Sequence, residues 1–220
     1  MEKILKESIM NLPNRITTAR ICLIPLFVFF YMADFIPGGY GKLVAAIIFA
    51  AASLTDFVDG KIARKRGLVT NLGKFLDPIA DKVLVMAGLI LVCAYPVTAN
   101  GGSRAPAPII TPEYIGAIFV IVLLARELIV SAFRQVAATK NVVLAADIYG
   151  KVKTTFQFIT LIYYFILAFL VQGFYSSVEG TAWTVLCIIG YVLLAVTLIL
   201  TIISGFNYIW KNRQVLKDAK

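Results

Sequence analysis

The sequence predicts an all-α integral membrane protein, with six transmembrane helices preceded by an interfacial amphipathic helix. Three observations support this fold class. Of the 220 residues, 60% are hydrophobic and 15% are charged, whereas soluble domains are about 45–50% apolar and about 25% charged. The apolar residues form long runs, and the basic residues gather between alternate runs. A soluble domain of this size could not bury so much apolar surface, so residues 1–220 are expected to form a single membrane domain.

The apolar runs are separated by segments whose composition favours turns and loops. Residues 37–41 and 98–112 are rich in Gly and Pro, and we expect them to connect helices outside the lipid. Before the first run, residues 1–12 place Ile4, Leu5 and Ile9 on one helix face, which predicts a juxtamembrane helix on the membrane surface. The six spans are expected at residues 21–36, 43–63, 77–97, 115–138, 156–174 and 183–209.

The basic residues predict the orientation of the chain. Nineteen of the 21 Lys and Arg residues lie on alternate connections or at the adjoining helix ends, leaving only Lys42 and Arg104 on the other side. Because cytosolic loops carry the excess of positive charge, we expect both termini in the cytosol. The net charge of +9 then forms a cytosolic face beside anionic lipid, in the cell (inner) membrane, and no nucleic acid is expected as partner.

Four acidic residues fall inside or at the edge of the second and third spans: Asp56, Asp59, Asp77 and Asp81. Intramembrane carboxylates are costly and are usually functional. Counted from the outer ends of the two spans, Asp56 and Asp81 lie at one depth, roughly 20 Å along helices that rise about 1.5 Å per residue. Spacings of three and four residues place each pair on one helix stripe. The alternative is simple ion pairing with neighbouring lysines and arginines at the helix border.

Divalent cations would resolve the repulsion among four converging carboxylates. In a medium of low dielectric, like charges and desolvation both raise carboxyl pKa values, so the four acids would not all stay ionised alone. The sequence contains no histidine. Oxygen ligands alone favour hard ions, and two Mg²⁺ or Mn²⁺ ions would balance the four charges and suit phosphate chemistry.

The acids belong to a longer motif, which reads Asp56-x2-Asp59-Gly60-x2-Ala63-Arg64-x8-Gly73-x3-Asp77-x3-Asp81. This motif resembles the signature of the CDP-alcohol phosphotransferases. The resemblance implies an integral membrane enzyme, often dimeric, that displaces CMP from a CDP-alcohol by attack of a second alcohol. It also implies that the four aspartates hold Mg²⁺ or Mn²⁺, with Asp81 serving in addition as the base for the incoming hydroxyl. The positions that it assigns to binding of the cytidine diphosphate are Asp56, Gly60, Ala63, Arg64 and Gly73.

Three further stretches narrow the resemblance. Residues 11–20, 125–131 and 150–154 are similar to stretches of bacterial phosphatidylglycerophosphate synthases. The implied reaction transfers the phosphatidyl group of CDP-diacylglycerol to sn-glycerol 3-phosphate, with additional contacts at Asn14, Thr18 and Arg20. Two alternatives stay open: another enzyme of the family, making phosphatidylserine, a phosphoinositide or cardiolipin, and a cation-coupled transporter, because intramembrane acids also line ion pathways.

The charges around the fourth cytosolic connection predict an acceptor site. The phosphate of glycerol 3-phosphate must be held away from the metals, because its hydroxyl has to reach phosphorus. We expect Arg126, Arg134, Lys151 and Lys153 to form this cationic pocket, with Glu127 orienting one of the arginines. The alternative is that these charges serve only to orient the chain in the membrane.

Overall fold

The computed structural model describes residues 12–66, 71–95, 97, 110, 113–139, 148–178 and 180–213, without the side chains of 12–16, 56–66, 71–75, 77–78, 113, 139 and 175–178. This part of the chain is helical and contains no strand. Its elements are α2 (Leu12–Met32), η1 (Pro37–Gly39), α3 (Tyr40–Arg66), α4 (Asn71–Ala94), α5 (Glu113–Thr139), α6 (Ile148–Val178) and α7 (Thr181–Lys211).

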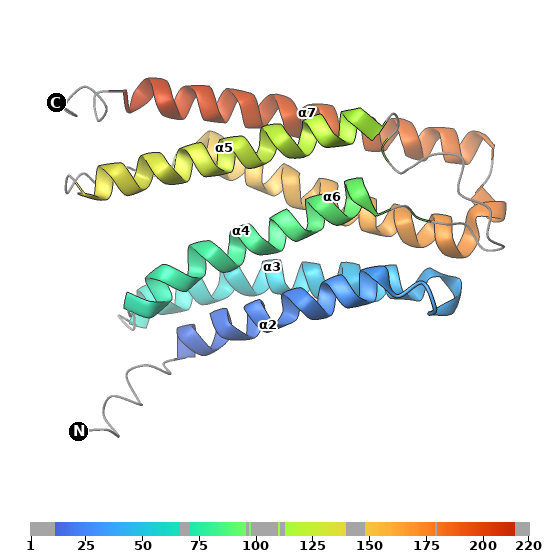
Figure 1. The fold of residues 1–220 in the computed structure, drawn as a ribbon, viewed down its shortest axis with the longest axis horizontal. Coiled ribbons are helices and arrows are strands. Elements are labelled where there is room, and N and C mark those ends of the chain that lie inside the picture. The colour runs from blue at the N-terminus through green and yellow to red at the C-terminus, as the bar shows by residue number, and fades with distance from the viewer. Residues whose placement is uncertain are drawn as a thin grey trace.

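The helices form an elongated bundle in which successive helices run in opposite directions (Figure 1). Helices α2, α3 and α4 make one side and α5, α6 and α7 the other, and the two sides meet where α6 packs on α3 and where α4 packs on α5 and α6. Helix α2 begins and α7 ends at the same end of the bundle, which we call the basic end. The η1 turn lies at the opposite end.

Each predicted span lies on one of these helices, although the ends differ. Within the described residues, four segments are long and apolar enough to cross a membrane: Pro37–Thr55, Tyr114–Ala138, Ile148–Phe174 and Thr181–Lys211. Thr17–Met32 is a shorter apolar helix. The juxtamembrane helix predicted at residues 1–12 lies outside the described residues, apart from Leu12, where α2 begins.

Aromatic packing joins three helices at the centre of the bundle. Phe27 of α2, Phe49 of α3 and Phe165 of α6 are fully buried. Their ring centroids lie 5.1–5.5 Å apart in tilted and edge-to-face pairs, the arrangements that aromatic rings prefer. This contact holds α6 against α2 and α3. The polar residues Lys153 and Gln157, nearer the start of α6, are buried in the same bundle.

At the η1 turn, backbone packs directly on backbone. Gly39 has a φ of +70°, and a Cβ there would lie 2.8 Å from the carbonyl oxygen of Phe169 in α6. A Cβ on Gly173 would overlap the carbonyl of Gly38. Only glycine fits these positions without displacing the main chain.

Beside this turn, Asp34 gathers three polar side chains from three helices into what we call the Asp34 cluster. Lys42 Nζ, which is fully buried, donates to Asp34 Oδ1 at 2.8 Å and also to the carbonyl of Tyr31. Tyr95 Oη donates to Asp34 Oδ2 at 2.5 Å, and Gln172 Nε2 donates to Oδ1 at 3.0 Å. Lys42, which the sequence marks only as a cation on the less basic side, therefore has a defined structural partner.

The Asp34 cluster lies beyond the ends of α2 and α4. Partial burial raises the pKa of Asp34, but the hydrogen bonds from Lys42 and Tyr95 outweigh it, so that the pKa is lowered overall. The hydrogen bond to Asp34, together with burial, raises the pKa of Tyr95 to about 12. The carboxylate is thus held ionised between its donors.

Candidate functional site

The acidic motif occupies two helices that run in opposite directions. Asp56 and Asp59 lie in α3, and Asp77 and Asp81 lie in α4. The helical backbone supports the predicted stripes, since residues three or four apart share a face. The side chain of Asp81 is half-buried. The side chains of the other motif positions lie outside the described residues: Asp56, Asp59, Gly60, Ala63, Arg64, Gly73 and Asp77.

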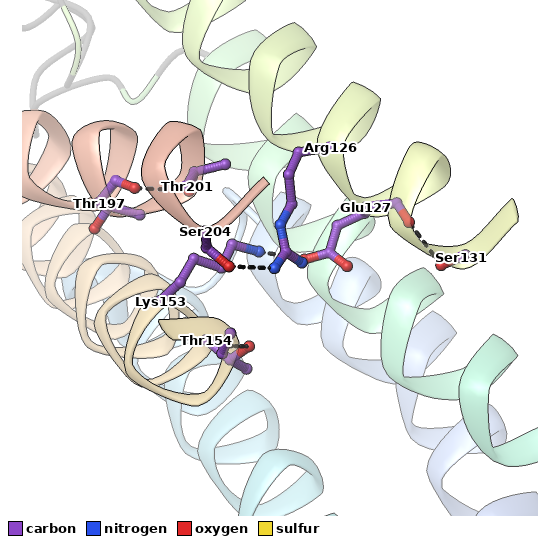
Figure 2. Close-up of polar contacts among 9 residues, drawn as sticks. Arg126, Glu127, Ser131, Lys153, Thr154, Thr197, Thr201 and Ser204 are labelled. Carbon is purple, nitrogen blue, oxygen red and sulfur yellow. Dashed lines mark hydrogen bonds and ion pairs between the residues drawn. The ribbon is translucent and has the colours of Figure 1, made fainter. Parts of the chain in front are cut away.

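Two cations and one carboxylate from α5 and α6 form what we call the Glu127 cluster: Arg126, Glu127 and Lys153 (Figure 2). Lys153 is fully buried, and its Nζ donates a hydrogen bond to Glu127 Oε1. Arg126 Nη1 lies 3.5 Å from the same oxygen. Asp81 of α4 also attracts Lys153 electrostatically, more weakly than Glu127 does. Lys153 therefore connects the acidic motif on α4 to the cations on α5.

Helix α7 provides the surface on which Arg126 lies. Arg126 Nη2 donates to Ser204 Oγ at 2.6 Å. A Cβ added to Gly205 would lie 3.1 Å from Arg126 Cγ, and one added to Gly150 of α6 would lie 3.6 Å from Nη2. Small residues on both neighbouring helices thus leave room for the arginine, and Ser204 sets the direction of its guanidinium.

The charge of the Glu127 cluster suits an anionic ligand. Two cations face one carboxylate, so the three residues of the cluster together carry a charge of +1, which adjoins the half-buried carboxylate of Asp81. A planar guanidinium and an ammonium are the two side-chain groups that bind phosphate best. The arrangement can hold a phosphate next to a carboxylate that accepts a proton, which is the combination that phosphoryl-group transfer to an alcohol requires.

The structure brings together only part of the predicted acceptor pocket. Arg126 and Lys153 meet through Glu127, as described above, whereas Arg134 lies about two turns further along α5. Arg134 Nε donates to Tyr208 Oη at 3.3 Å, and its guanidinium lies 5.5 Å from the centre of the Tyr208 ring. Lys151 is exposed at the start of α6. The two arginines and two lysines therefore divide into an inner pair and an outer pair.

The additional contact residues all lie in the first turns of α2. Arg20 is buried, with 1% of its surface exposed, and Thr18 is exposed. The side chain of Asn14 lies outside the described residues. A buried arginine at the basic end of the bundle suits a role in the site.

Sequence reasoning missed the hydroxyl groups of α7. Thr197, Thr201 and Ser204 are buried on one face, and Thr197 Oγ1 lies 2.8 Å from Thr160 Oγ1 of α6. Thr201 Oγ1 donates to the carbonyl of Thr197 at 2.7 Å. Spacings of four and three residues within an apolar run were the signal, because they place all three hydroxyls on one stripe toward neighbouring helices.

Comparison with known proteins gives a family and named relatives. The pattern of the CDP-alcohol phosphatidyltransferase family matches residues 10–203. A protein of Bacillus subtilis is 38% identical over 218 residues, which cover 95% of this chain and 98% of the relative. A relative from Rickettsia felis is 34% identical, and the match covers 90% of this chain and 93% of the relative. A relative from Pectobacterium atrosepticum is 35% identical, and the match covers 94% of this chain and 98% of the relative. All three carry the name CDP-diacylglycerol–glycerol-3-phosphate 3-phosphatidyltransferase. The matched region includes both helices of the acidic motif and all of the Glu127 cluster.

Proposed function

The chain belongs to the CDP-alcohol phosphatidyltransferase family, and from this premise we propose that it transfers the phosphatidyl group of CDP-diacylglycerol to sn-glycerol 3-phosphate, releasing CMP. The names of the relatives support this reaction. The single structural observation that carries it is the Glu127 cluster, whose Lys153 is attracted electrostatically by Asp81. The products are phosphatidylglycerophosphate and CMP.

The acidic motif is proposed to hold Mg²⁺ or Mn²⁺, with two ions as the expected number. Asp56, Asp59, Asp77 and Asp81 supply only carboxylate oxygens, a donor set that fits these hard cations. When bound, the ions would neutralise the diphosphate of CDP-diacylglycerol. In the same proposal, Asp56, Gly60, Ala63, Arg64 and Gly73 border the cytidine diphosphate.

The residues of the Glu127 cluster are proposed to bind and orient the acceptor. Arg126 and Lys153 hold its phosphate by charged hydrogen bonds, which keeps that phosphate away from the reacting phosphorus. Glu127 keeps the Lys153 ammonium in place through the hydrogen bond seen between them. Asp81 then takes the proton of the acceptor's 1-hydroxyl group. The oxygen of that hydroxyl attacks the phosphorus bonded to the lipid alcohol, and CMP leaves.

The setting of the reaction is part of the proposal. By the positive-inside rule, the basic end of the bundle and both termini lie in the cytosol, and the site opens there in the cell (inner) membrane. Membrane lipid surrounds the apolar helices. Six membrane crossings, the surface helix at residues 1–12 and a homodimer are expected from the sequence and the family resemblance.

The test is an acceptor panel with purified protein in detergent. CDP-diacylglycerol is offered with glycerol 3-phosphate, serine, inositol, inositol phosphate or phosphatidylglycerol, and CMP release is measured with and without Mg²⁺ or Mn²⁺. We expect release with glycerol 3-phosphate and its loss after chelation of the metal. Release with a different alcohol would reassign the acceptor. No release with any alcohol would favour the cation-coupled transporter instead.

A further inference from the structure

Gln157 is a buried amide for which the proposed reaction has so far given no role. It lies in α6 four residues after Lys153, and therefore on the same helix face. Only 2% of its surface is exposed, and its Nε2 has no hydrogen-bond partner among the described residues. Lys153 before it and Thr160 after it are both paired, with Glu127 and Thr197. The Nε2 group of Gln157 is thus an unpaired donor between two hydrogen-bonded side chains, those of Lys153 and Thr160, on one buried face of α6.

An unpaired buried amide donor is destabilising, and an acceptor atom on a bound molecule would satisfy it. Gln157 lies one turn deeper than Lys153, roughly 6 Å along the helix. In glycerol 3-phosphate, four bonds separate phosphorus from the 2-hydroxyl oxygen, a span of roughly 4–5 Å at about 1.5 Å per bond. An acceptor whose phosphate rests on Lys153 is therefore long enough to bring its 2-hydroxyl to Gln157.

The chemistry of the acceptor selects one of its oxygens. The phosphate already has Arg126 and Lys153 as donors. The 1-hydroxyl oxygen is the attacking atom, and an N–H group donated to its lone pair would weaken its attack. The 2-hydroxyl is the oxygen that still lacks a donor.

We propose that Gln157 donates a hydrogen bond from Nε2 to the 2-hydroxyl of the bound acceptor and so selects glycerol 3-phosphate over phosphorylated alcohols that lack this group. The proposal rests on the proposed function. It assigns Gln157 a binding role in specificity and leaves the chemical step to Asp81.

The test uses 3-hydroxypropyl phosphate, which keeps the phosphate and the reacting hydroxyl of glycerol 3-phosphate but lacks the 2-hydroxyl. For wild-type protein, we expect kcat/KM to favour glycerol 3-phosphate about tenfold, the worth of one hydrogen bond of about 1.4 kcal/mol. In Gln157→Leu, which replaces the amide by an apolar side chain of comparable volume, we expect this preference to fall below threefold. Activity with 3-hydroxypropyl phosphate should persist, which also shows that the variant folds.

Gln172→Leu is the matched control. Gln172 is a buried amide of the same helix, but it donates to Asp34 at the opposite end. This variant should keep the tenfold preference. Equal losses with both acceptors in Gln157→Leu, with the preference intact, would overturn the proposal, as would a wild-type protein that does not distinguish the two phosphates. A wild-type protein that uses neither phosphate but releases CMP with another alcohol would instead overturn the proposed function.

Discussion

Ser204 of α7 accepts a hydrogen bond of 2.6 Å from Arg126 of α5, across 78 residues of sequence. The bond brings α7, which carries none of the acidic motif, into contact with the proposed acceptor site. It also holds the guanidinium toward Glu127 and Lys153, as Figure 2 shows. The position of the phosphate-binding groups therefore depends on the packing of three helices and not on α5 alone.

Arg126→Gln and Lys153→Gln are each expected to raise the KM for glycerol 3-phosphate at least tenfold. A hydrogen bond to a charged group contributes about 1.5–3 kcal/mol, and about 1.4 kcal/mol corresponds to a factor of ten. The KM for CDP-diacylglycerol should change little. Arg134→Gln and Lys151→Gln test the outer pair. We expect each to raise the KM for glycerol 3-phosphate less than threefold, because Arg134 packs on Tyr208 and Lys151 is exposed. Equal effects of all four changes on this KM would instead support a pocket formed by all four cations.

Ser204→Ala should raise the KM for glycerol 3-phosphate by about threefold to tenfold. The lost hydrogen bond to Arg126 contributes about 0.5–1.5 kcal/mol and frees the guanidinium to leave the site. Thr197→Ala is the control, since Thr197 is buried on the same stripe but contacts Thr160 and not Arg126. Steady-state kinetics on both variants would contradict the assigned role of Ser204 if the two changed KM equally.

Asp81→Asn should reduce kcat by about 10²–10⁴, the usual contribution of a general base. Binding of CDP-diacylglycerol should largely survive, because three of the four proposed metal ligands remain. Single-turnover CMP release and a separate binding measurement distinguish the two effects. Turnover above a tenth of the wild-type rate would rule out Asp81 as the base.

The Asp34 cluster predicts a pH dependence of stability. The pKa of Asp34 is lowered in the folded protein, so its contribution is complete above the unfolded value of 3.8 and is lost as the pH falls through the lower, folded value. Because 42% of the Asp34 side chain is exposed, we expect its charge to add only about 1 kcal/mol to the free energy of unfolding. At pH 7 the wild-type Tm should then be about 2–4 °C higher than that of Asp34→Asn. Thermal unfolding in detergent should show this gap closing below about pH 4. A gap that stays constant with pH would contradict the charged contact.

Single cysteines test the orientation of the bundle. In a background without Cys22, Cys93 and Cys187, a cysteine at the exposed Phe35 should react with an impermeant thiol reagent added to intact cells. One at the exposed Ile148, at the basic end, should react only after the cells are opened. Reversed labelling would overturn both the orientation and the cytosolic access of substrates.

Apolar periodicity was enough to predict the helices but not where they end. The prediction placed the start of the fifth span at residue 156, whereas α6 begins at Ile148. Lys153 lies in the part of α6 that precedes the predicted span, because a cation is not counted into an apolar run. It is buried because Glu127, which is 26 residues away, lies opposite it after folding. The prediction for the first span ran to residue 36, but α2 ends at Met32, where the Asp34 cluster begins.

The candidate site was predictable to the extent that its chemistry lies in local spacing. The acidic motif could be read from intervals of three and four residues on single helices. The contact of Ser204 with Arg126 and the convergence of Arg126 and Lys153 on Glu127 depend on how α5, α6 and α7 pack, and spacing along a single helix does not give those partners. Tertiary contacts between distant helices therefore decide which of the predicted cations face Asp81.

The glycine contacts at the η1 turn hold one end of α6 rigidly against the main chain of the turn. Because main chain touches main chain at Gly39 and Gly173, no flexible side chain there can absorb movement, and this end acts as the pivot. Lys153 lies 20 residues away on the same helix, roughly 30 Å at about 1.5 Å per residue. A rotation of about 5° at the pivot would displace Lys153 by roughly 2–3 Å, nearly the length of a hydrogen bond. The contacts of Phe165 with Phe27 and Phe49, between this pivot and Lys153, oppose such a rotation and so keep the Lys153 ammonium opposite Glu127.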